Sequence, residues 1–241
     1  MLYFRPLWKL TVASAILFAI LISLGLWQLD RLQWKLSLIA QVNANMHAAP
    51  ISPEEAIAKG DGAQYHRVAL AGRFDNSKEA YVFGTEDGAP VYHVIVPFTT
   101  RDDRVFLVDR GIVPKEKIDP ATRRAGLIDG DTHVVGVWRT PDPPGLFTPA
   151  PDAARRIWFA HDLKSIAKFD GIKVLAASAL IEADATPNPG GWPKGGQTVV
   201  TFRNEHLQYA ITWFGLAAVL FGVYVAYHIS RGRLRFGRPV P

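Results

Sequence analysis

The chain has 241 residues, of which 27 are basic and 22 acidic, and it contains no cysteine. The absence of thiols excludes a cysteine nucleophile, haem attached covalently through a CxxCH motif and a thiolate zinc site. The chain has only two methionines, so a surface of sulfur ligands for copper(I) is also excluded. The net charge of +5 resembles that of a nucleic-acid-binding protein, but the excess lies in two short tails, so no nucleic-acid partner is expected.

Two segments of 20 residues, 10–29 and 210–229, contain no charged side chain. As helices they would each span roughly 30 Å, the thickness of the hydrocarbon core of a bilayer. Aromatic residues flank both segments, as is typical of membrane interfaces. We therefore predict two transmembrane helices. The first apolar segment is longer than that of a signal peptide and no small-residue cleavage site follows it, which favours an uncleaved anchor.

The charge distribution predicts the orientation in the membrane. All acidic residues lie between Asp30 and Glu205, whereas six basic residues lie outside that range: Arg5, Lys9, Arg231, Arg233, Arg235 and Arg238. Basic residues concentrate on the cytoplasmic side of membrane proteins. We expect residues 1–9 and 230–241 to be cytoplasmic and residues 30–209 to form a domain on the far side.

The segment before Leu10 is too short for a mitochondrial presequence, which favours the inner membrane of a bacterium. The far-side domain would then be periplasmic, and membrane lipid would surround the two helices.

Helical spacing continues through residues 30–45, and Ser52-Pro53-Glu54-Glu55 predicts a helix start, with the helix ending at Gly60. From Tyr65 the apolar period changes to two, which predicts seven strands. They cover residues 65–72, 79–84, 91–99, 103–111, 132–139, 157–161 and 173–184. Residues 162–169 predict a short helix. The fold class expected is a membrane α+β protein with a mainly antiparallel sheet or small barrel and one or two short helices.

The segment VDRGIVP (108–114) ends one of these predicted strands and carries adjacent charges. Arg110 could bind a carboxylate such as a propionate, because the guanidinium group suits that geometry. The structural alternative, which the residues favour, is an ion pair between Asp109 and Arg110 with Gly111 and Pro114 in a turn.

The segment GLWQLDR (25–31) lies where the first apolar segment ends. Gly25 permits the close approach of another helix. Gln28 and Arg31 share a face, but a polar face at the membrane exit requires no further function.

His206 precedes the second apolar segment and shares a helical stripe with Tyr209, Ala210 and Trp213. Asn204 could cap this helix. A neutral imidazole beside aromatic faces could bind the iron of a planar macrocycle. From spacing alone, the alternative of a polar residue at the lipid interface is favoured.

Several segments together resemble the Surfeit-locus-one family of cytochrome oxidase assembly proteins. They are LGLWQLDRLQWK, the AGRFD strand end, VDRGIVP, GLFTP and NEHLQYAITWF, in this order between about Leu24 and Leu216. The family usually has Trp at the position of Ile112 and Asn at that of Glu205. The second difference places an acid beside His206, where it could orient the imidazole.

The resemblance implies an assembly factor, not an enzyme, that assists the insertion of haem a into the catalytic subunit of cytochrome c oxidase. It implies His206 as the iron ligand, with Tyr209 and Trp213 against the macrocycle and Arg110 as a propionate partner. The oxidase subunit and haem a synthase are the partners expected. Two alternatives remain open: a scaffold for a partly assembled subunit that binds no cofactor, and a membrane-tethered enzyme. General catalytic motifs such as GxSxG and HExxH are absent from the sequence.

Overall fold

The computed structural model describes residues 2–200 and 202–236, which form two compact units. The helical unit consists of the described residues of Met1–Gln41 and Thr201–Pro241. The barrel unit consists of Val42–Val200. Each unit has its own packing and is described separately.

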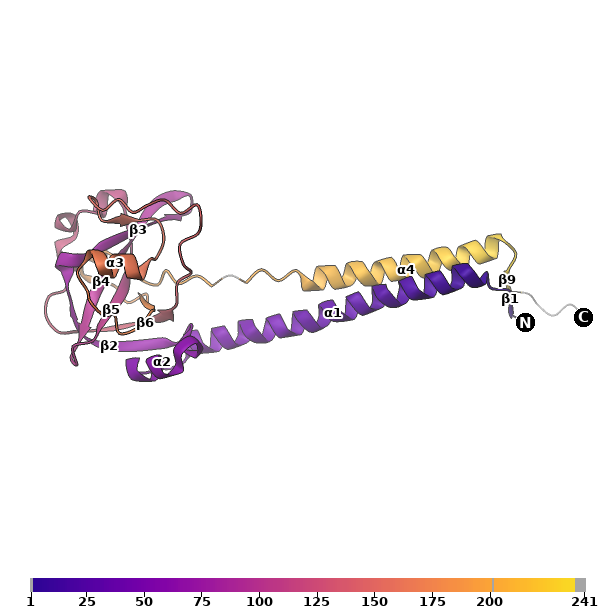
Figure 1. The fold of residues 1–241 in the computed structure, drawn as a ribbon, viewed down its shortest axis with the longest axis horizontal. Helices are drawn as coiled ribbons and strands as arrows, with labels where there is room; N and C mark the ends of the chain where they lie inside the picture. Colours follow the sequence, from indigo (N-terminus) through magenta and orange to yellow (C-terminus); the bar gives the residue numbers. More distant parts are fainter. Residues whose placement is uncertain (1, 201, 237–241) are drawn as a thin grey trace, which may run out of the picture. The chain divides into compact units, whose positions relative to one another are not determined.

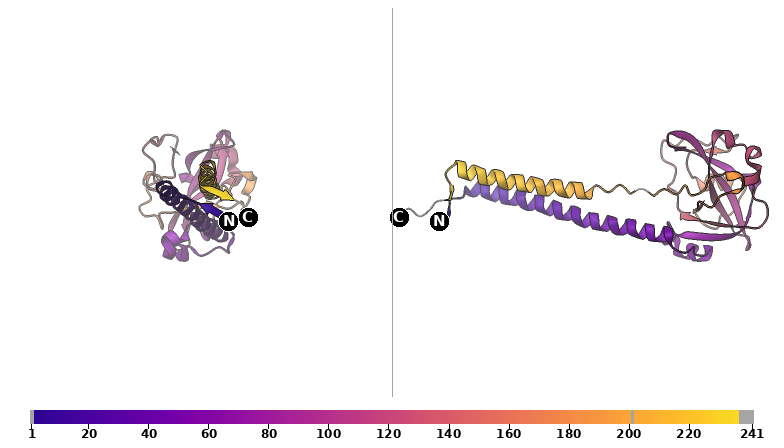
Figure 2. Two further views of the ribbon diagram at one scale, coloured as in Figure 1. Left: turned by 90° about the vertical axis from the view of Figure 1, so that its right-hand side faces the viewer. Right: turned by 180° about the vertical axis from the view of Figure 1, so that it is seen from behind.

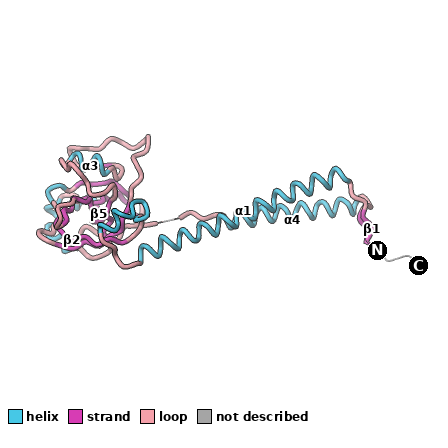
Figure 3. The backbone as a smooth tube through the Cα atoms, turned by 60° about the horizontal axis from the view of Figure 1, so that its bottom comes forward, coloured by secondary structure: helices cyan, strands magenta, loops and turns pink. Residues whose placement is uncertain are grey.

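Two long helices make up most of the helical unit. They are α1 (Trp8–His47), whose last residues belong to the barrel unit, and α4 (His206–Ser230), and they lie side by side (Figures 2 and 3). They contact each other at three levels: Thr11 with Tyr224, Gly25 with Phe214, and Gln28 with His206. Positions rise along α1 as they fall along α4, so the helices are antiparallel. The short strands β1 (Leu2–Phe4) and β9 (Leu234–Phe236) pair beyond one end of the helices.

Both helices are long and apolar enough to cross a membrane. Their outward faces expose large apolar side chains, including Ile16 on α1 and Val219 and Phe221 on α4. Apolar surface of this extent is stable against lipid rather than water. The structure therefore confirms the two predicted apolar helices and the continuation of the first through residues 30–45.

The barrel unit contains seven strands: β2 (Arg67–Phe74), β3 (Ala80–Glu86), β4 (Ala89–Thr100), β5 (Val105–Pro114), β6 (Thr132–Arg139), β7 (Ile157–Trp158) and β8 (Leu180–Ala183) (Figure 1). Their order in the sheet is β2-β6-β8-β5-β4-β3-β7. The end of β2 also pairs with β4, so five strands close into a small barrel and β3 and β7 extend it. The pairs β3–β7 and β5–β8 are parallel and the remaining pairs are antiparallel, which confirms the predicted mainly antiparallel β domain.

Two predicted strands are much shorter than expected. Only Ile157–Trp158 of segment 157–161 and only Leu180–Ala183 of segment 173–184 form ladder pairs. In the second segment, Leu175 packs against the core beside the short helix α3 (Leu163–Phe169) instead of entering the sheet, as does Ile172 just before the segment. An apolar sequence indicates that a segment is buried, but not that it pairs with another strand. For this reason the predicted lengths of these two strands are wrong.

The sheet has a core on each face. Inside the barrel, side chains from all five closing strands meet, among them Leu70, Phe98 and Phe106. On the outer face, α3 and Trp158 cover a second apolar layer that includes Ile95 and Leu107. The polar side chains of His93, Asp109 and His161 lie together on the same outer face.

The short helices begin as their sequences predict. The Ser52 hydroxyl accepts the Glu55 N–H at the start of α2 (Pro53–Lys59), and Gly60 follows the last residue. Asp162 caps α3 in the same way through the Ser165 N–H. Five 3₁₀ helices complete the barrel unit: Gly60–Ala63, Asn76–Lys78, Lys115–Lys117, Pro120–Gly126 and Pro189–Gly191.

A buried ion pair ties one of these 3₁₀ helices to the start of β3. Arg123 donates two hydrogen bonds to the Glu79 carboxylate, at 3.0 and 2.5 Å, and both side chains are at most 3% exposed. The Tyr81 hydroxyl also donates to Glu79 at 3.0 Å. Burial and the charge of Glu79 raise the pKa of Tyr81, so this hydroxyl stays a donor.

We predict that Arg123→Met destabilises the barrel unit by about 3–5 kcal/mol, because it leaves the Glu79 carboxylate buried without its cation. Arg101→Met is the matched control, since Arg101 pairs with Asp131 at the exposed surface and should contribute less than about 1 kcal/mol. Thermal unfolding of the purified protein, followed by near-ultraviolet circular dichroism, measures both. Equal melting temperatures for the two variants would contradict this assignment.

The close packing of α1 against α4 requires a glycine at position 25. A Cβ atom at this position would lie 2.6 Å from the Phe214 ring, whereas one at Gly222 would meet no atom within 4 Å. We predict that Gly25→Val forces the helices apart and costs about 1–3 kcal/mol, while Gly222→Val is nearly neutral. Thermal denaturation of the detergent-solubilised variants tests the difference. A Gly25→Val protein as stable as Gly222→Val would show that close helix packing is unimportant here.

Candidate functional site

The candidate site is the end of the helix pair where α4 begins. His206 is the first residue of α4, and its Nδ1 lies 2.7 Å from the side-chain oxygen of Gln28 on α1. Gln28 is only 8% exposed, although it lies in an otherwise apolar stretch. A buried amide is stable only when it is hydrogen-bonded, so the partner on α4 accounts for its position.

The contact with Gln28 sets the tautomer of the imidazole. Because the amide oxygen can only accept, Nδ1 of His206 donates, and in the neutral imidazole the lone pair lies on Nε2. Among the described residues, Nε2 makes no hydrogen bond. Histidines that bind metal ions are commonly held in this way, with one nitrogen donating to a neighbour and the other directed at the metal.

The other residues of the predicted stripe have different surroundings. Ala210 is buried at the helix interface, whereas Tyr209 is 51% exposed and Trp213 is partly exposed. His206 and Ala210 thus lie on the side of α4 that contacts α1, and Tyr209 lies on its flank. The structure provides an imidazole and an accessible aromatic face at the same helix end.

Two details near His206 differ from the expectations. The residue at the cap position of α4 is Glu205 rather than Asn204, and no side chain caps the helix. Glu205 accepts a hydrogen bond of 2.7 Å from Arg203, which keeps its pKa below the usual range. It therefore pairs with a neighbouring arginine and does not orient the imidazole, a role that Gln28 takes.

Arg110 lies in the barrel unit and is 1% exposed. Its Nη2 donates to the Gly126 carbonyl oxygen at 2.7 Å and to the Asn188 side-chain oxygen at 3.0 Å. Its guanidinium group also lies 4.5 Å from the centre of the Phe74 ring. Burial lowers its pKa to about 10, with Glu79 opposing and Arg123 adding to the shift. Its Nη1 has no hydrogen-bond partner among the described residues, but the burial of the whole side chain separates it from a propionate outside the barrel unit.

The VDRGIVP segment forms a β-bulge and not the predicted strand end. His93 pairs with Ile112 and Ile95 pairs with Asp109, so β5 carries one more residue than β4 between these pairs. Gly111 has φ +110°, and a Cβ there would lie 1.9 Å from the Lys194 carbonyl oxygen, so only glycine fits. Asp109 and Arg110 consequently have separate partners, and the predicted ion pair between them is wrong.

Together, the fold and this site define a membrane-anchored protein with two apolar helices and a small mixed β-barrel. The SURF1 family model matches residues 15–218. Surfeit locus protein 1 of Mus musculus is 37% identical over 214 residues, which cover 81% of this chain and 68% of the mouse protein. The SURF1-like protein of Rickettsia conorii is 33% identical over 219 residues, 88% of each chain. The chain therefore belongs to the SURF1 family.

Two features of the structure escaped sequence reasoning. The interpretation of Gln28 as a polar residue at the membrane exit is incomplete, because a polar residue near the end of an apolar segment signals a hydrogen-bond partner on another helix. A cluster of His93, Asp109 and His161 in the barrel unit was also missed. Its members come from three distant segments, and no spacing pattern connects them.

We predict that Gln28→Leu changes the protonation pattern of His206, because it removes the acceptor that holds the proton on Nδ1. Imidazole ¹⁵N chemical shifts of the haem-free protein should show a single Nδ1-protonated form in the wild type and a tautomer mixture in the variant. Gln208→Leu, an exposed glutamine on α4, is the control and should leave the shifts unchanged. Identical spectra for wild type and Gln28→Leu would remove Gln28 from the site.

Proposed function

We propose that this protein is an assembly factor for haem–copper cytochrome c oxidase that holds haem a through His206 and assists its insertion into the catalytic subunit. The observation that carries the proposal is the hydrogen bond between His206 and Gln28. With Nδ1 donating to Gln28, Nε2 of the neutral imidazole lies at a helix end, where it could bind iron. Membership of the SURF1 family agrees with this function.

The residues at this helix end suit a haem. The imidazole supplies a nitrogen ligand, and the exposed ring of Tyr209, with Trp213 one turn further along α4, offers apolar surface to a macrocycle. Lipid around the helices would keep water from the rest of a hydrophobic porphyrin. Bound haem a would supply the redox-active iron of the oxidase. The protein's own part is to hold the imidazole in one tautomer and one orientation.

Arg110 has no part in this proposal, because its guanidinium group is buried among partners inside the barrel unit. The proposed setting is the inner membrane of a bacterium, with both termini cytoplasmic and the barrel unit periplasmic. Antiparallel helices and the pairing of β1 with β9 agree with this arrangement, since the two described ends of the chain meet. The partners proposed are the oxidase catalytic subunit and haem a synthase.

The test compares haem a content among variants purified from cells that make this haem. We expect His206→Ala to lose the haem, and Gln28→Leu to bind it about 10–100-fold more weakly, as removal of an orienting partner usually does. His133→Ala, an exposed histidine of β6, should match the wild type. If His206→Ala retains the wild-type haem content, His206 is not the ligand.

The scaffold alternative makes a different prediction. A scaffold would co-purify with the oxidase catalytic subunit from a strain that cannot make haem a, and His206→Ala would not affect this association. A haem carrier would associate with the subunit only when haem is present. The same purification, repeated in the two strains, separates the alternatives.

A further inference from the structure

Two histidines and an aspartate meet on the outer face of the barrel unit. His93 comes from β4, Asp109 from β5, and His161 from the loop between β7 and α3. One possible ligand atom from each residue lies within 4.8 Å of the other two. Oδ2 of Asp109 lies 2.7 Å from Nδ1 of His93 and 4.0 Å from Nε2 of His161. This cluster is separate from His206, which belongs to the helical unit.

The β-bulge in β5 produces this arrangement. Strict alternation would place Asp109 and Ile112 on opposite faces of the sheet, but the extra residue brings both to the outer face, where His93 also lies. The Gly111 N–H donates to Oδ1 of Asp109 at 2.8 Å and orients the carboxylate. Gly84 on β3, diagonal to His93, leaves space for the His93 ring, since a Cβ there would lie 3.3 Å from the ring. Backbone geometry therefore aims the second carboxylate oxygen at the two imidazoles.

The His161 side chain has a ring nitrogen without a hydrogen-bond partner among the described residues. This nitrogen, Nε2, is buried. Buried polar atoms in folded proteins are nearly always paired, so an orphaned ring nitrogen beside a carboxylate indicates a missing water or ion. A metal ion between the three side chains would satisfy this nitrogen.

The donor set has a definite chemical preference. Two imidazole nitrogens and one carboxylate oxygen, without thiolate, suit divalent ions of the first transition series such as Zn²⁺, Co²⁺ or Fe²⁺. Donor atoms around such an ion lie about 3.3 Å apart in a tetrahedral site with bonds near 2.0–2.1 Å. The separations of 2.7 and 4.0 Å bracket this value, so small side-chain rotations would complete the site.

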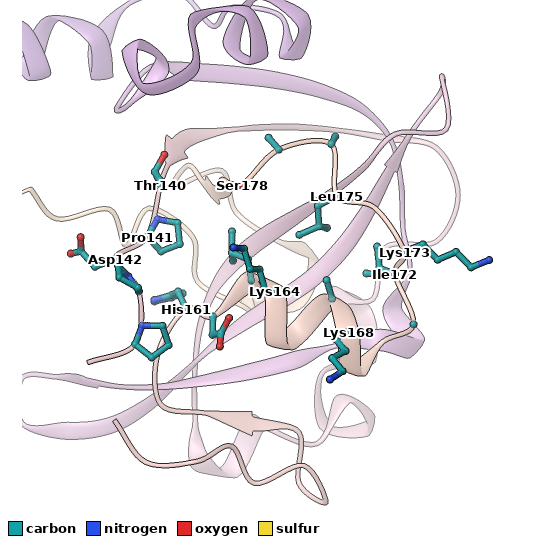
Figure 4. A pocket seen from close by; sticks show the side chains of 18 residues that line it. Thr140, Pro141, Asp142, His161, Lys164, Lys168, Ile172, Lys173, Leu175 and Ser178 are labelled. Atoms are coloured by element: carbon teal, nitrogen blue, oxygen red, sulfur yellow. The ribbon is translucent and has the colours of Figure 1, made fainter. Parts of the chain in front are cut away.

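One member of the cluster, His161, also lines a cavity. The cavity, of about 950 Å³, lies between the loop that carries Pro141 and Asp142 and the helix that carries Lys164 (Figure 4). Glu182 is the β8 neighbour of Asp109 and borders a second cavity of about 320 Å³ together with His161. Its carboxylate is held by Arg139 and Thr198, at 3.3 and 2.7 Å. An ion bound by three side chains would thus keep a coordination position open towards the cavity.

We propose that His93, Asp109 and His161 form a binding site for one divalent transition-metal ion, with an open position facing the cavity beside α3. The site is independent of the function proposed for His206. Loss of haem binding at the helix end would leave it intact.

Cobalt(II) is a direct probe, because its visible absorption reports nitrogen and oxygen ligands. The full-length protein, purified from cells unable to make haem a and treated with chelator, is titrated with Co²⁺ and then with Zn²⁺. We expect one saturable Co²⁺ site per chain, displaced by Zn²⁺. His161→Gln should weaken it by at least about 100-fold, since even second-shell substitutions cost 10–100-fold.

The controls separate ligand loss from misfolding and from surface binding. His133→Gln should bind Co²⁺ as the wild type does, and so should His206→Ala. His93→Gln and Asp109→Asn should also lose the site, and His161→Gln decides the outcome if either variant fails to fold. The proposal is overturned if the wild type shows no saturable Co²⁺ absorption, or if His161→Gln, folded by circular dichroism, binds as tightly as the wild type. In either case the cluster is only a His93–Asp109 hydrogen-bonded pair with His161 packed against it.

Discussion

A polar side chain on an apolar helix must find its hydrogen-bond partner on a neighbouring helix, and this constraint governs the helical unit. Gln28 on α1 satisfies it with His206, and Thr11 near the other end satisfies it with Tyr224, at 2.8 Å. Two such contacts so far apart fix both the register and the antiparallel direction of the pair. The same hydrogen bond that aligns the helices also sets the tautomer of the only histidine at that helix end, so structure and proposed chemistry share one interaction.

In the barrel unit, the buried groups that need partners are charged side chains. Arg123 and Arg110 are both enclosed, the first by the Glu79 carboxylate and the second by neutral oxygens and an aromatic ring. The Glu79 carboxylate accounts for Arg123, whereas Nη1 of Arg110 is buried without a hydrogen-bond partner among the described residues. The cluster of Asp109 and two histidines also holds such an atom, Nε2 of His161. The cluster differs from the surroundings of Arg110 because three possible ligand atoms lie within 4.8 Å of one another there.

The sequence predicts those helices and strands whose apolar residues repeat at a regular spacing. The two apolar helices, the Ser52 and Asp162 caps and most strands follow from spacing of two or 3.6 residues. The closure of β2 on β4 and the parallel position of β8 depend on pairing between distant segments, which spacing does not encode. For the site, His206 could be identified from its position and from the family resemblance. Its partner Gln28 and the His93 cluster required the fold, because hydrogen bonding across elements brings these residues together.

The bulge at Gly111 also determines how the barrel tolerates changes in length. Strand residues alternate between the inside and the outside of a barrel, so the extra residue inverts the phase of everything that follows it on β5. Val113 faces the interior only because of this inversion. If β5 alternated regularly at its present length, Ile112 and Val113 would exchange environments, whereas deletion of the extra residue would leave both on their present faces. The bulge therefore lets Asp109 and Ile112, three positions apart, share the outer face of the sheet.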